Sequence, residues 1–110
     1  MNVSLVNLNN LSEDELNEFI LKFLSLLKND IAEDNKEELY KVIIDKLFEI
    51  NQSHKRKYSL ANSFKQIKNT SQKNSIIEGL FDLISFFESI EEYESCALIK
   101  KIKDNLLMDL

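Results

Sequence analysis

Proline is absent from this 110-residue chain, and glycine occurs only once, as Gly79. These two residues mark most turns of β proteins, so their scarcity argues against a fold built on sheets. Apolar residues instead recur at spacings of three and four, which is the period of an amphipathic helix. The composition therefore predicts a chain made almost wholly of helices, with turns built from asparagine and serine.

Cysteine and histidine also occur only once each, as Cys96 and His54. One cysteine cannot form an internal disulfide and the N-terminus lacks the pattern of a signal peptide, so we expect a cytoplasmic location. We expect Cys96 to be a small buried hydrophobic residue, and His54, beside three basic residues, to be a solvated loop residue. Because the HExxH, CxxC and glycine-rich phosphate motifs are missing, the sequence predicts no metal, no cofactor and no enzyme activity.

Long apolar runs are missing as well, because polar residues such as Lys22 interrupt every hydrophobic stretch. A membrane span needs about 20 consecutive apolar residues, so we expect no membrane partner. With 44% hydrophobic and 30% charged residues, the chain has the composition of a globular protein. We predict an all-α fold, a compact bundle of four to five antiparallel helices in a single domain over residues 1–110, in which 1–11 form a lead segment that need not be ordered.

The start of the first helix is the clearest local pattern. Ser12 and Glu15 have the spacing of a capping box, in which each side chain bonds the other residue's backbone N–H. An apolar face follows at helical spacing, made of Leu16, Phe19, Ile20, Phe23 and Leu27.

Four further helices are predicted from capping residues and apolar spacing. The second is expected to begin after Asp34 or Asn35, the third to cover Arg56 to Lys68, the fourth to follow a cap at Thr70 or Ser71, and the fifth to run from Glu91 to Leu107. Gly79 lies inside the fourth helix, where it costs about 1 kcal/mol relative to alanine. We therefore expect another helix to cross closely at Gly79, or the fourth helix to bend there.

The middle of the chain contains no acidic residue. Residues 1–49 hold eleven acidic and five basic residues, 50–77 hold six basic residues and no acidic one, and 78–110 hold eight acidic and three basic residues. The net charges of these blocks are −6, +6 and −5, in a chain of net charge −5. The basic residues of the middle block are Lys55, Arg56, Lys57, Lys65, Lys68 and Lys73.

Three interpretations of this basic segment stay open. The favoured one is that it pairs with acidic helices of its own bundle; the others are that it binds a partner protein or, through residues 55–73, nucleic acid. Together with the missing enzyme motifs, this pattern predicts a non-catalytic protein–protein interaction module, such as a small acidic regulator, adaptor, inhibitor or immunity-type protein. A nucleic-acid-binding helical protein is the alternative.

The predicted fourth and fifth helices carry apolar residues around more than one face. Either both helices lie centrally in the core, or one stripe binds a partner or a second copy of the chain. The candidate for such a stripe is Leu98, Ile99, Ile102 and Leu106.

Overall fold

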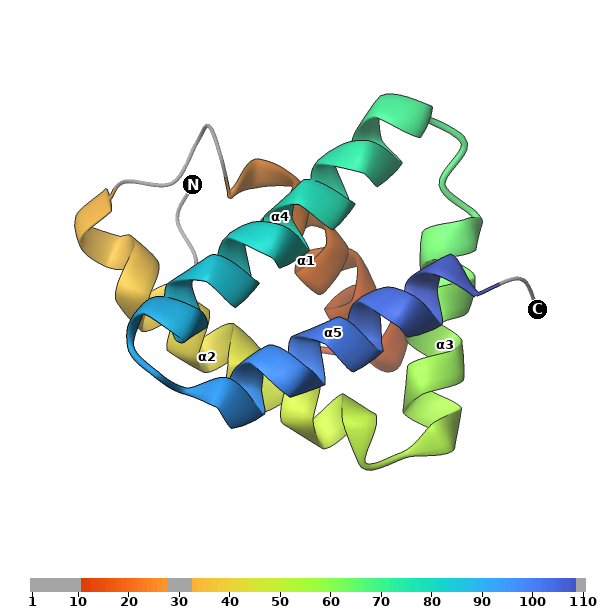
Figure 1. Cartoon of the computed structure of the whole chain (residues 1–110). Coiled ribbons are helices and arrows are strands. Elements are labelled where there is room, and N and C mark those ends of the chain that lie inside the picture. Colours follow the sequence, from red (N-terminus) through yellow and green to blue (C-terminus); the bar gives the residue numbers. More distant parts are fainter. Residues whose placement is uncertain (1–10, 28–32, 109–110) are drawn as a thin grey trace.

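The computed structural model of the chain describes residues 11–27 and 33–108. These residues form the helices α1 (Glu13–Leu26), α2 (Glu33–Asn51), α3 (His54–Lys65), α4 (Thr70–Ser89) and α5 (Tyr93–Leu107), and contain no strand. The predicted all-α bundle is therefore confirmed (Figure 1). None of the described helices is long and apolar enough to cross a membrane.

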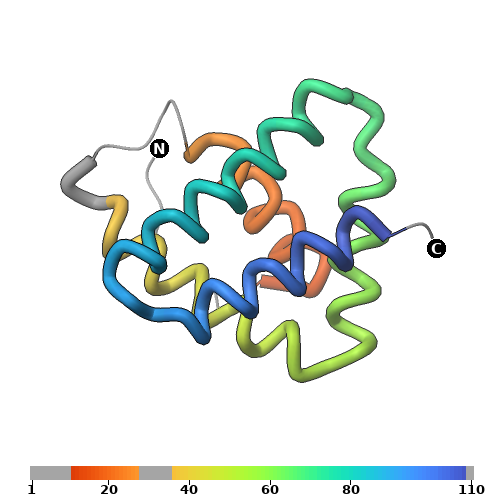
Figure 2. The backbone as a smooth tube through the Cα atoms, in the orientation of Figure 1, coloured from red at the N-terminus to blue at the C-terminus, as the bar shows by residue number. Residues whose placement is uncertain are grey.

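Helix α5 packs along α4, and α1 and α3 cross near this pair (Figure 1). Helices α4 and α5 form an antiparallel pair, and α1 crosses behind α4 (Figures 1 and 2). Helix α3 lies beside the C-terminal end of α5 and also contacts α1 and α2. Helix α1 therefore packs against two other helices, α4 and α3.

Helix α1 begins as its sequence predicts. The Ser12 hydroxyl accepts a hydrogen bond from the Glu15 backbone N–H at 3.2 Å, and the Glu15 carboxylate accepts one from the Ser12 backbone N–H at 3.1 Å. Two hydrogen bonds lower the pKa of Glu15: the larger effect comes from the Ser12 backbone N–H and the smaller from the Ser12 side chain. The capping box is thus complete when Glu15 is ionised, and its contribution to stability is lost as the pH falls through that lowered pKa.

Gly79 lies where α4 crosses α1. A Cβ atom added to Gly79 would collide with the backbone carbonyl of Leu24, so only glycine lets the two helices come this close. Helix α4 continues without interruption through this position. The first of the two explanations offered for Gly79, a close crossing by another helix, is confirmed.

The end of α4 has the hydrogen bonds of a Schellman motif, but without its usual glycine. The backbone N–H of Glu91 donates to Glu88 at 3.1 Å and that of Glu92 donates to Phe87 at 2.9 Å. Glu91 adopts the left-handed backbone conformation with φ 61°. This conformation is costly for a residue with a Cβ atom, so Glu91 is a strained position at the turn into α5.

Several predicted helix boundaries were wrong by about one turn or less. Helix α2 starts at Glu33, so Asp34 and Asn35 lie inside it rather than before it. Helix α4 is capped by Asn69, whose side chain accepts a hydrogen bond from the Gln72 backbone N–H at 3.1 Å; Thr70 and Ser71 are its first residues. Serine, threonine, asparagine and aspartate can all cap a helix, so a cluster of them does not single out one start.

Helices α3 and α5 also differ from their predicted ranges. Helix α3 runs from His54 to Lys65, because Ser53 caps it and its side chain accepts a hydrogen bond from the Arg56 backbone N–H. His54 is thus an exposed residue in the first helical turn and not in a loop. Helix α5 begins at Tyr93, two residues after the predicted start, because the α4–α5 turn uses Glu91 and Glu92.

Candidate interaction surface on the third helix

The six predicted basic residues lie on α3, on the linker that follows it and on the first turn of α4. Lys55, Arg56 and Lys57 are in the first turn of α3, and Lys65 is its last residue. Lys68 is in the linker and Lys73 follows in α4. The segment therefore places positive charge at both ends of one short helix.

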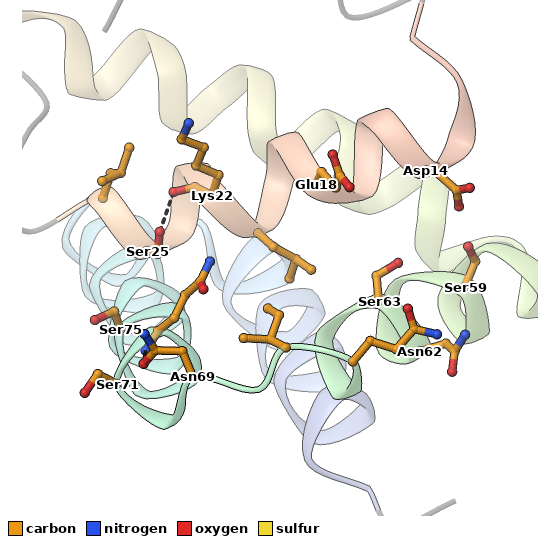
Figure 3. Close-up of a pocket in the computed structure, with 15 residues that line it drawn as sticks. Asp14, Glu18, Lys22, Ser25, Ser59, Asn62, Ser63, Asn69, Ser71 and Ser75 are labelled. Carbon is orange, nitrogen blue, oxygen red and sulfur yellow. Dashed lines mark hydrogen bonds between the residues drawn. The ribbon is translucent and has the colours of Figure 1, made fainter.

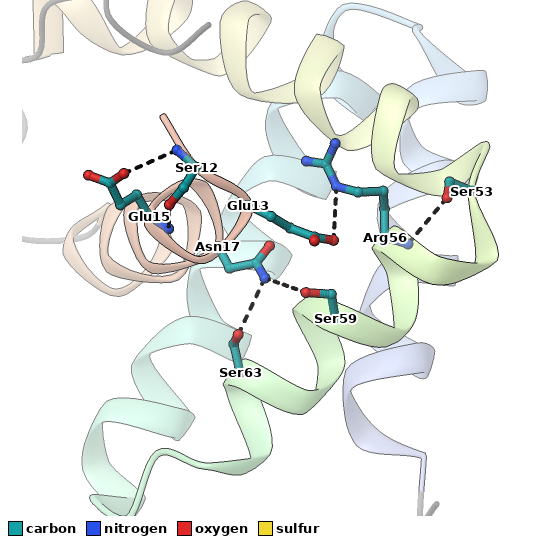
Figure 4. Close-up of polar contacts among 8 residues, drawn as sticks. All are labelled: Ser12, Glu13, Glu15, Asn17, Ser53, Arg56, Ser59 and Ser63. Carbon is teal, nitrogen blue, oxygen red and sulfur yellow. Dashed lines mark hydrogen bonds and ion pairs between the residues drawn. The ribbon is translucent and has the colours of Figure 1, made fainter. Parts of the chain in front are cut away.

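Arg56 is neutralised within the bundle. Its Nε atom lies 3.5 Å from Oε1 of Glu13, the first residue of α1, in a half-buried ion pair (Figure 4). Both atoms are shielded from solvent, and neither has a hydrogen-bond partner in the described part of the chain. For Arg56, the prediction that the basic segment pairs with an acidic helix of its own bundle is confirmed.

Lys73 also has an internal role. Its ammonium group donates a hydrogen bond to the Lys65 backbone carbonyl at 3.3 Å and lies 5.5 Å from the centre of the Phe64 ring. A positive charge at the carbonyl end of a helix is favourable, because the last carbonyl groups have no partner within the helix. Lys73 therefore helps to terminate α3 and belongs to the structure of the α3–α4 connection.

The other four lysines differ from these two. Within the described residues, none of Lys55, Lys57, Lys65 and Lys68 forms an ion pair with a carboxylate. The side chains of Lys55 and Lys68 are exposed, and those of Lys57 and Lys65 are half-buried. Internal pairing therefore accounts for Arg56 but not for these four positive charges.

A depression lies between the start of α3 and the end of α5, with a volume of about 630 Å³. The side-chain amide of Asn105 donates a hydrogen bond to the Lys57 carbonyl at 3.2 Å, which joins its two walls. Tyr58 stands at its edge with 61% of its surface exposed. The lining is His54, Lys55, Lys57, Tyr58 and Asn105, with no carboxylate among them. We call these five residues the basic depression.

A second, larger groove runs between α1, α3 and the start of α4 (Figure 3). Its lining is rich in serine, asparagine and glutamine, and α1 contributes Asp14, Glu18 and Lys22. Figure 3 shows Ser59 and Ser63 on α3 facing this space across from α1. The groove therefore offers mostly neutral hydrogen-bonding groups, in contrast to the positive charge of the basic depression.

Asn17 joins α1 to α3, and its buried position was not predicted from the sequence. The side chain is fully buried, and its Nδ2 donates to the hydroxyl oxygens of Ser59 at 2.9 Å and Ser63 at 3.3 Å (Figure 4). Its Oδ1 has no partner among the described residues. The pattern that could have revealed it is its place on the apolar stripe of α1, one helical turn before Ile20 and Leu21.

The predicted partner stripe on α5 is part of the core. Leu98, Ile99, Ile102 and Leu106 are between 0 and 4% exposed. They are covered because α5 packs against α2, α3 and α4 together. Of the two explanations left open for this stripe, a central place in the core is the one found, and the stripe is not available as a docking surface in this fold.

The remaining candidates for chemistry behave as structural groups. Cys96 is buried, its thiol donates to the Ile84 carbonyl at 3.4 Å, and burial followed by the nearby charge of Glu88 raises its pKa. Cys96 is thus a buried hydrophobic residue, as predicted, and its thiol stays protonated near neutral pH. Among the residues that the structure describes, no three histidine, cysteine or acidic side chains lie close enough together to hold a metal ion.

Comparisons with known proteins add no family to this picture. No family model matches the chain, and no similar protein is found among curated proteins or solved structures. The charges and shape of the surface described above are therefore the basis for inferring a function.

Proposed function

We propose that the chain is a non-catalytic binding module that docks an acidic protein partner through lysines of α3 and of the linker that follows it. The observation that carries this proposal is a set of four lysines that pair with no carboxylate among the described residues, namely Lys55, Lys57, Lys65 and Lys68. We call this set the lysine surface. Like charges left unpaired repel one another, and an acidic partner would remove that repulsion.

The dimensions of the lysine surface favour a short acidic segment of a protein. Lys55 and Lys65 are separated by about 15 Å along α3, at the helical rise of 1.5 Å per residue. A helix of about ten residues spans this distance. A long nucleic acid would extend past α3 and approach acidic side chains of α1, such as Asp14 and Glu18, where its phosphates would be repelled.

A labelled acidic peptide of about ten residues, mainly glutamate with one central leucine, tests this proposal. Fluorescence anisotropy would compare the unmodified protein with the variant Lys55→Gln/Lys68→Gln, which loses one exposed lysine near each end of the surface. We expect Kd to rise about five- to tenfold, because each rim charge contributes up to about 1 kcal/mol.

The matched control is Lys22→Gln/Lys100→Gln, which removes the same charge from exposed positions on α1 and α5. It should change Kd by less than about twofold at physiological ionic strength, where distant charges are screened. Equal losses in the two variants would show that net charge alone drives binding and would contradict the proposal. A single-stranded oligonucleotide bound more tightly than the peptide, with the same dependence on Lys55 and Lys68, would favour the nucleic-acid alternative instead.

A further inference from the structure

The basic depression combines two residues of the lysine surface, Lys55 and Lys57, with a recess and an exposed aromatic ring. Lys55 and Lys57 are two of its lining residues, and Tyr58, which is 61% exposed, supplies the ring. At the other end of α3, Lys73 is already engaged with the Lys65 carbonyl and the Phe64 ring. The two ends of α3 thus hold equal numbers of lysines without a carboxylate partner among the described residues, and the recess with its exposed ring distinguishes the start.

The walls of the basic depression are fixed relative to each other. Asn105 comes from the last turns of α5 and Lys57 from the first turn of α3, and the hydrogen bond between them ties these distant segments together. The start of α3 is further held by the ion pair of Arg56 with Glu13. A recess that is already formed binds with a smaller loss of conformational freedom than one that must form on binding.

We infer that the basic depression is the anchor point of the lysine surface and receives a carboxylate side chain of an acidic protein segment, with a neighbouring apolar side chain packed on Tyr58. This inference rests on the proposed function. Lysine binds anions as a flexible point charge, and tyrosine buries a large area at interfaces while its hydroxyl keeps a polar contact. Tyrosine is also among the residues that most often dominate the energy of protein interfaces.

The groove lined by serine and amide side chains is the other candidate site for the acidic segment, but its acidic residues disfavour the binding of a carboxylate. On its α1 side the two carboxylates of Asp14 and Glu18 outnumber Lys22 and would repel an acidic segment, whereas the lining of the basic depression contains no carboxylate. An acidic segment is thus drawn to the α5 side of α3 and away from the α1 side.

Tyr58→Ala is the variant that tests the anchor, measured with the same acidic peptide by fluorescence anisotropy. Tyr93→Ala is its matched control, because Tyr93 is 63% exposed compared with 61% for Tyr58 but lies between Glu92 and Glu94. We expect Tyr58→Ala to raise Kd about tenfold, Tyr58→Phe to raise it less than about threefold, and Tyr93→Ala to leave it unchanged. Both tyrosines are exposed, so circular dichroism should show an unaltered fold.

Chemical shift mapping gives a second readout, because the side-chain amide of Asn105 should shift when the peptide binds. If Tyr58→Ala binds as well as the unmodified protein while Lys55→Gln/Lys68→Gln does not, the anchor is wrong and the proposed function stands. If the unmodified protein does not bind the peptide at all, both fail. A short oligonucleotide that competes with the peptide and depends more strongly on Tyr58 would overturn the assignment of a carboxylate ligand.

Discussion

Helix α1 meets α4 and α3 by opposite means. Against α4 it packs so closely that Gly79 has no room for a Cβ atom beside the backbone of Leu24. Against α3 it uses the polar contacts of Asn17 with Ser59 and Ser63 and the ion pair of Glu13 with Arg56, and some buried polar atoms there stay without a partner among the described residues.

The two contacts of α1 differ in how much they contribute to the stability of the bundle. Apolar contacts between closely packed helices contribute most to stability, whereas a polar seam with unsatisfied groups contributes little net free energy. The α1–α4 crossing therefore stabilises the bundle, while α3 is held by weaker contacts on one side and presents the lysine surface on another. Two substitutions test this contrast, and a third tests the turn that follows α4.

The largest effect is expected at the α1–α4 crossing. Gly79→Ala should lower the free energy of unfolding by about 3 kcal/mol, because the added methyl group meets the Leu24 backbone and forces the helices apart. Chemical denaturation followed by circular dichroism measures this loss. Ser85→Ala, at an exposed position of the same helix, is the control and should change stability by less than about 0.5 kcal/mol.

The direction of the Gly79 effect is itself informative. In an unconstrained helix the same change to alanine is stabilising by about 1 kcal/mol. A Gly79→Ala protein that showed this full gain of about 1 kcal/mol would mean that α1 and α4 can separate without cost, and the contrast with α3 would be lost.

A smaller loss is expected at the α1–α3 seam. Asn17→Ala removes two hydrogen bonds to α3 but also removes an unpartnered buried oxygen, so we expect a loss of about 1–2 kcal/mol in the free energy of unfolding. The same denaturation experiment on Ser63→Ala and on the double variant gives the coupling between the two residues. Effects that simply add would mean that the bond between Asn17 and Ser63 contributes nothing measurable.

A gain is expected where α4 turns into α5, and it is the smallest change of the three. Glu91→Gly should raise the free energy of unfolding by about 0.5–1 kcal/mol, because glycine adopts the left-handed conformation without the strain of a Cβ atom. Glu94→Gly, within α5, should instead destabilise the protein by about 1 kcal/mol. A loss at both positions would show that the strain at Glu91 is absent in solution.

Much of the fold could be predicted because its determinants lie close together in the sequence. The capping box joins residues three apart, and Gly79 stands out as a glycine within a strong helical pattern. The exact boundaries were harder, since several adjacent polar residues could each cap a helix. Ile90 continues the helical spacing of the buried Leu83 and Phe87 but is 40% exposed, because α4 ends at Ser89 and leaves Ile90 in the turn.

The candidate site was predictable only in part. The basic segment was visible as a block without acidic residues, but neither the recess beside Tyr58 nor the role of Asn105 could be inferred. Asn105 reaches the basic depression through the packing of α5 against α3, and no local pattern indicates which helices become neighbours.

The amino-acid sequence by itself determined that this protein is helical, where its first helix starts and that its positive charge is concentrated in the middle of the chain. These features depend on hydrogen bonds and side-chain spacing within a few residues. Only the tertiary structure decided that Arg56 meets Glu13, that the Leu98 to Leu106 stripe is buried and that the other four lysines of α3 and its linker have no carboxylate partner in the described part of the chain. Burial and ion pairing depend on which helices pack together, and that packing joins residues far apart in the sequence.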